Sequence, residues 1–233
     1  MRVPAYLEVA DRKVFASAVD WPGWCRSAKD EAAALKALVA YAHRYAVVAH
    51  RAGWTLGATR PCGASEAGDA LVGEFAGTTL AGEGIEVDVV ERLPGSSGTT
   101  FGVPMAIADG DRVALSSAAA ERQAELVAAA WAVLGQVIAT APAVLRKGPR
   151  GGGRDRDAIA AHVNEAEIAY ARKLGVRLRK PKIEELRESL LSVLRMPSDR
   201  QALAEGGWPA RYGARRIAWH ALDHAWEIED RSS

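Results

Sequence analysis

Three of the five histidines in this 233-residue chain occupy positions where their side chains can meet. His220 and His224 are four residues apart, so they project from the same face of a helix. His162 lies in an earlier helical stretch, on a face that it shares with apolar residues. We therefore expect all three imidazoles to converge inside a helical core. Neutral imidazoles bind zinc, nickel or iron, and three protein ligands leave one position for water or substrate, as in catalytic zinc sites.

The alternative interpretation is that these are ordinary buried histidines that pair with carboxylates, because an HxxxH pair also arises in helices by chance. Ala221 follows His220 where zinc metalloproteases of the HExxH type carry glutamate, so that motif's built-in general base is absent. Glu165 lies one turn from His162, and Glu227 lies three residues beyond His224. Either carboxylate is a candidate catalytic residue, as a general base or by orienting a ligand imidazole, and a solvated helix face is the alternative for each.

The secondary structure that must position these residues is expected to change near residue 115, from mainly strands to helices. Before that point we expect strands at 5–9, 14–19, 85–89 and 101–105, and one helix that starts at Ser27 or Asp30 and ends at Gly53. After it we expect four amphipathic helices, which begin near residues 116, 155, 182 and 209, the pattern of a four-helix bundle. The sequence thus predicts an α+β protein, with a small β-β-α-β-type α/β module over residues 1–114 and a four-helix bundle over 115–233.

Composition excludes several classes of protein. The net charge of +1 and the pI near 7.8 argue against nucleic acid as a partner, and two cysteines cannot build a disulfide framework. No apolar core of signal-peptide length is present near the N-terminus. The longest apolar stretch, 126–143, is interrupted by Gln136 and Pro142, so we expect no membrane span and a cytoplasmic protein.

The segment Arg215-Arg216-Ile217-Ala218-Trp219-His220-Ala221-Leu222-Asp223-His224-Ala225-Trp226-Glu227-Ile228-Glu229-Asp230, with His162 in a helix after a glycine-rich loop, resembles the DinB-like superfamily of YfiT type. The resemblance covers 116–233, half of the chain. It implies a four-helix bundle with a divalent metal on His162, His220 and His224. It also implies a small-molecule substrate, a low-molecular-weight thiol cosubstrate such as mycothiol or bacillithiol, and a homodimer, because members often dimerise.

The first half resembles the small HicB-like module, which serves in antitoxins or in accessory roles. The resemblance rests on Val19-Asp20-Trp21-Pro22-Gly23-Trp24-Cys25 followed by a helix that contains Glu31; an insertion at 57–84 departs from the pattern. The combined expectation is a metal-dependent enzyme that activates a thiol or water toward a small electrophile, as a transferase, isomerase or hydrolase. The alternative is a non-catalytic module that binds a ligand or protein and keeps a structural or vestigial metal site.

Overall fold

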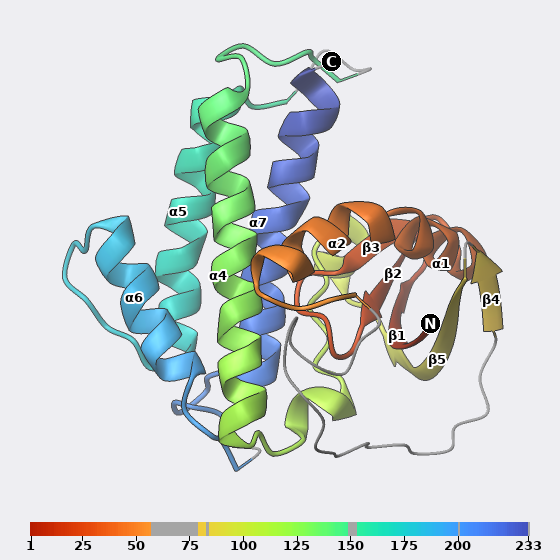
Figure 1. Cartoon of the computed structure of the whole chain (residues 1–233), viewed down its shortest axis with the longest axis horizontal. Helices are drawn as coiled ribbons and strands as arrows, with labels where there is room; N and C mark the ends of the chain where they lie inside the picture. Colours follow the sequence, from red (N-terminus) through yellow and green to blue (C-terminus); the bar gives the residue numbers. More distant parts are fainter. Residues whose placement is uncertain (57–78, 83, 149–152, 200, 233) are drawn as a thin grey trace. The chain divides into compact units, whose positions relative to one another are not determined.

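The computed structural model describes residues 1–56, 79–82, 84–148, 153–199 and 201–232. Most of the insertion expected at 57–84 lies outside these residues. The chain is a mixed α/β protein that divides into two compact units, Met1–Gly110 and Asp111–Ser233. Each unit is described by itself (Figure 1).

The first unit contains a five-stranded sheet in the order β3-β2-β1-β5-β4. β1 and β2 form an antiparallel hairpin around the turn at Asp11, while β1 pairs with β5 in parallel, and the remaining pairs are antiparallel. The short strand β3 was not expected from the sequence. The strands are β1 Arg2–Ala10, β2 Lys13–Ala18, β3 Cys25–Ala28, β4 Thr79–Gly82 and β5 Ile85–Pro94.

Two helices, α1 (Glu31–Ala40) and α2 (Ala42–Arg51), cover one face of this sheet (Figure 1). We expected a single helix, but it divides at Tyr41. Asp30 caps α1, because its Oδ1 accepts a hydrogen bond from the Ala33 amide at 2.8 Å. The ring of Trp24 stacks on Tyr45 with the ring centroids 5.4 Å apart, and its Nε1 donates to the Leu38 carbonyl at 2.9 Å. These contacts hold the turn that contains Trp24 against both α1 and α2.

The prediction of a strand at 101–105 is wrong. Residues Ser97–Phe101 form a short helix, α3, which begins with a capping box between Ser96 and Thr99, and the Phe101 side chain is 88% exposed. Two backbone amides after α3 donate hydrogen bonds to a side chain and not to a neighbouring strand. The carboxylate of the fully buried Glu8 accepts from the Met105 amide at 3.0 Å and from the Ala106 amide at 2.9 Å. A 3₁₀ helix, η1 (Asp109–Arg112), follows.

The second unit is helical, and its four described helices begin within a few residues of the expected positions. α4 packs along α7 and also contacts α5 and α6, while α5 contacts both α6 and α7 (Figure 1). Ser116 caps α4 by accepting the Ala119 amide. The helices are α4 Ser117–Thr140, α5 Arg156–Lys173, α6 Ile183–Leu194 and α7 Ala210–Ser232.

Two ion pairs with a buried member hold elements of this unit together. Glu167 of α5 receives a two-point hydrogen bond from Arg187 of α6, at 2.9 and 3.0 Å. Asp111 receives a similar bond from Arg215 of α7, with Nε to Oδ1 at 3.1 Å, and both side chains are buried. The two pairs therefore fix α5 relative to α6 and α7 relative to the start of the unit.

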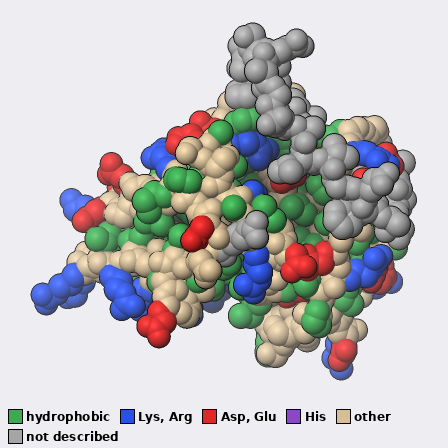
Figure 2. Space-filling model, turned by 90° about the horizontal axis from the view of Figure 1, so that it is seen from below, with side chains coloured by type: hydrophobic (Ala, Val, Ile, Leu, Met, Phe, Trp, Pro, Cys, Tyr) green, Lys and Arg blue, Asp and Glu red, His purple; other side chains and the backbone are tan. Residues whose placement is uncertain are grey.

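By length and composition alone, α4 is apolar enough to cross a membrane, but 56% of its most apolar window is buried inside the protein. Core helices of globular proteins share this pattern. Basic and acidic side chains are interspersed on the face drawn in Figure 2, and no patch of one sign dominates there.

Candidate metal centre

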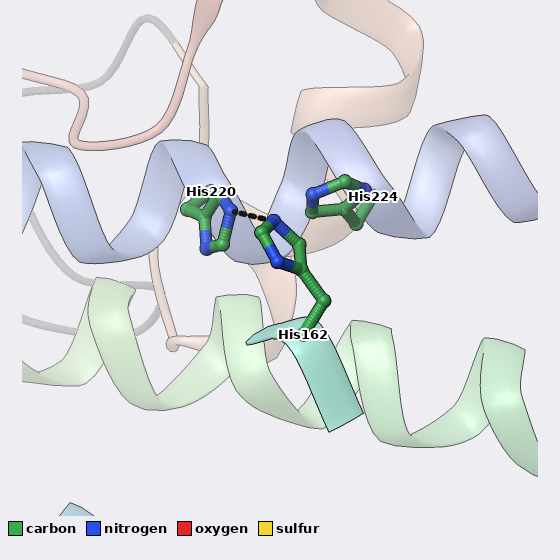
Figure 3. Close-up of side chains that lie close together, drawn as sticks. All are labelled: His162, His220 and His224. Carbon is green, nitrogen blue, oxygen red and sulfur yellow. Dashed lines mark hydrogen bonds between the residues drawn. The ribbon is translucent and has the colours of Figure 1, made fainter. Parts of the chain in front are cut away.

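Three imidazoles from two helices meet in the second unit. His162 projects from α5 toward His220 and His224, which lie one turn apart on α7 (Figure 3). One nitrogen from each ring can be chosen so that all three lie within 4.8 Å of one another. The helix packing of α5 on α7 thus brings together the three histidines that the sequence singled out.

The distance between two of these nitrogens suits a tetrahedral ion. Nε2 of His162 lies 3.3 Å from Nε2 of His220. Tetrahedral ligands at metal–nitrogen distances of about 2.0–2.1 Å lie about 3.3–3.4 Å from each other. A hydrogen bond between two neutral imidazoles gives a similar separation, so the distance fits a metal ligand pair without requiring one.

His224 is oriented by a carboxylate. Its Nδ1 lies 2.8 Å from Oε2 of Glu227, and the other oxygen of that carboxylate accepts from Nη1 of Arg231 at 2.6 Å. The hydrogen bond from His224, helped by the charge of Arg231, holds the pKa of Glu227 below its ordinary value. An ionised Glu227 favours the Nδ1–H form of His224, which leaves the Nε2 lone pair for a ligand role.

Glu165, the other candidate carboxylate, has a different environment. It is exposed on α5, one turn after His162, and its negative charge opposes the fall of the His162 pKa. The structure therefore separates the two carboxylates: Glu227 contacts a histidine ring, whereas Glu165 faces solvent beside the cluster.

Burial keeps two of the histidines neutral. Desolvation lowers the pKa of His220 to about 2, and the electrostatic interactions with His224 and Arg216 act in the same direction. Desolvation, followed by the electrostatic interaction with His224, also lowers the pKa of His162. Neutral rings keep a free lone pair at neutral pH, and metal binding needs that lone pair.

The ring of His220 is held by packing. It lies edge-on to Tyr170, with the centroids 5.7 Å apart, and against Trp219 at 5.8 Å. Its Nδ1 is buried and makes no hydrogen bond to any described residue. The guanidinium of Arg216 lies over both aromatic rings. These neighbours fix the orientation of the His220 ring, as the hydrogen bond to Glu227 does for His224.

The sequence interpretation missed several of these residues. Arg216 lies one turn before His220, and Arg231 lies one turn after Glu227, so the i, i+4 spacing on one helix was a signal for both. Tyr170 lies on α5 in another part of the sequence, and its place beside His220 follows only from the packing of α5 on α7.

Comparisons with family models, with curated proteins and with solved structures found no match to this chain.

Proposed function

We propose that the second unit is a DinB-like four-helix bundle and that the protein is a metal-dependent enzyme. The metal ligands in this proposal are His162, His220 and His224, with zinc as the first choice of divalent ion and nickel or iron as alternatives. One observation carries the proposal: three imidazoles from two helices present donor nitrogens within 4.8 Å of one another. The lowered pKa values of His162 and His220 support it, because both rings are neutral when a metal would bind.

A divalent ion in this site would lower the pKa of a thiol or water, or polarise a carbonyl, toward a small electrophilic substrate. The chain's own residues have separate tasks in this proposal. Glu227 orients His224, while the aromatic rings around His220 fix its direction. Glu165 is the carboxylate that faces solvent beside the cluster and is the one placed to exchange a proton with water.

The class of reaction we propose is thiol-dependent transfer, isomerisation or hydrolysis, with a low-molecular-weight thiol as cosubstrate. We further propose a cytoplasmic homodimer in which residues 1–114, which include the whole first unit, form a HicB-like accessory module. The reaction class and the homodimer follow from the resemblance of the helical half to the DinB-like superfamily, together with the geometry of the three histidines. The accessory module follows from the resemblance of the first half to the HicB-like module.

Metal analysis tests the site. The protein is purified without a histidine tag, dialysed against zinc and then against buffer, and its zinc content is measured. We expect one zinc per chain, and none after His220→Ala. His43→Ala is the matched control, because it removes an exposed histidine from the other unit and should keep the ion. A zinc content unaffected by His220→Ala refutes the site.

A second measurement separates enzyme from binding module. The zinc-loaded protein is mixed with a panel of activated electrophiles, with and without a small thiol, and conversion of the electrophile and loss of free thiol are both followed with time. We expect turnover that disappears in His220→Ala. Zinc binding without turnover of any thiol or water reaction favours a non-catalytic module in which the metal is structural or vestigial.

A further inference from the structure

Arg231, near the end of α7, joins the histidine cluster to the connection between α4 and α5. Its Nη1 donates to Glu227 at 2.6 Å, and its Nε donates to the carbonyl of Arg146 at 2.9 Å. The backbone amide of Arg146 in turn donates to the carbonyl of Arg231 at 2.9 Å. The Arg231 side chain is only 13% exposed. Its guanidinium is therefore fixed at two points, one of which is the carboxylate that contacts His224.

Because Gly153 has no side chain, the guanidinium of Arg231 can lie against its backbone. A Cβ atom at Gly153 would lie 2.8–3.1 Å from Nη2, Cζ and Nη1 of Arg231, which is closer than carbon atoms approach without displacement. The φ of Gly153 is +120°, a conformation that other residues rarely adopt. Nη2 is buried and forms no hydrogen bond to described residues, so the position of the guanidinium depends on Nη1, Nε and this close packing.

We propose that Arg231 is a positioning residue of the three-histidine site, acting through Glu227 to keep the proton of His224 on Nδ1. This inference rests on the proposed function, because the Nδ1–H form leaves Nε2 of His224 free, and that Nε2 is the proposed ligand atom. Glu227 is about one-third exposed, so without Arg231 its carboxylate can turn toward solvent. His224 then loses its acceptor, and the Nε2–H form, which cannot bind a metal through Nε2, becomes populated.

The tautomer of His224 is measured first, in metal-free protein at pH 8, from the ring ¹⁵N chemical shifts of histidine-labelled full-length chain. We expect the Nδ1–H form in the wild type and a mixture of both forms in Arg231→Gln. Arg195→Gln is the matched control, because it breaks a half-exposed arginine–glutamate pair of the same unit, at 3.1 Å from Glu121, and should leave His224 unchanged.

Zinc affinity is measured next, by competition with a chelator. Loss of an outer hydrogen-bond partner typically weakens a metal site 10–100-fold, so we expect Arg231→Gln to bind zinc roughly tenfold more weakly. Gly153→Ala should shift the tautomer and the affinity in the same direction by displacing the guanidinium. Gly206→Ala is its control, because Gly206 has φ +61° but no atom near the position of a Cβ.

The outcomes separate this inference from the proposed function. Zinc binding by the wild type, with the tautomer and affinity unchanged in both Arg231→Gln and Gly153→Ala, overturns the role of Arg231. A wild type that shows the Nδ1–H form, loses it in Arg231→Gln, and yet binds no zinc overturns the metal site and leaves the positioning of His224 intact. Melting curves of all variants establish that each is folded.

Discussion

The metal-free protein should lose stability in mild acid because of His220. Its pKa in the folded protein is about 2, whereas an unfolded histidine titrates near 6.5. The unfolded chain therefore binds this proton first, so the free energy of unfolding begins to fall as the pH drops below about 6.5 and continues to fall toward pH 2.

The size of the effect follows from proton linkage. Between pH 7 and pH 5 the unfolded state gains about 2 kcal/mol from protonation of this one ring, while the folded state gains almost nothing. The result depends little on the folded pKa, because any value below about 4 gives nearly the same loss over this interval. The lowered pKa of His162 adds to the loss in the same direction.

Urea unfolding with a chelator present, followed by far-ultraviolet circular dichroism at pH 7, 6 and 5, measures this loss. His220→Gln should show a decline about 2 kcal/mol smaller than the wild type between pH 7 and pH 5. His43→Gln, which removes an exposed histidine of the first unit, serves as the control and should decline as the wild type does. Equal declines in His220→Gln and the wild type would refute the claim that His220 is buried in its neutral form.

Three further predictions concern the second unit and use the same unfolding assay at pH 7. Asp111→Asn should cost roughly 3–5 kcal/mol, because it leaves the buried Arg215 guanidinium without its negative partner; a loss below 1 kcal/mol would contradict the pair. Ser116→Ala should cost about 1 kcal/mol by removing the α4 cap, and no loss would mean that the cap contributes nothing. Gly135→Ala should stabilise α4 by roughly 0.5–1 kcal/mol, since no atom lies near the new methyl group; destabilisation would contradict that open space.

Local signals in the sequence account for much of the helical half. Ser116 marks the start of α4, and Pro142 follows its end, because a hydroxyl satisfies free amides and proline cannot continue a helix. The hairpin of β1 and β2 likewise follows from two strand-like runs on either side of Asp11. In the first unit the same reasoning failed where the deciding contacts are distant. The strand expected at 101–105 is absent because Glu8, about a hundred residues away, accepts the amides there.

The candidate site shows the same division between local and distant information. That His220 and His224 share a face follows from the helical repeat alone. That the His162 nitrogen approaches His220 to 3.3 Å depends on how α5 lies against α7, which residue spacing does not specify. Residue spacing likewise does not decide whether Glu227 acts as a base or orients a ligand imidazole, and its contact with His224 Nδ1 favours the orienting role.

The most direct test of the central claim is a crystal structure of the zinc-loaded, untagged protein with diffraction data collected on both sides of the zinc absorption edge. We expect one anomalous peak per chain, about 2.0–2.1 Å from a ring nitrogen of each of His162, His220 and His224, with a fourth position filled by an exchangeable ligand. The absence of any peak at these three histidines, in crystals soaked in excess zinc, would contradict it.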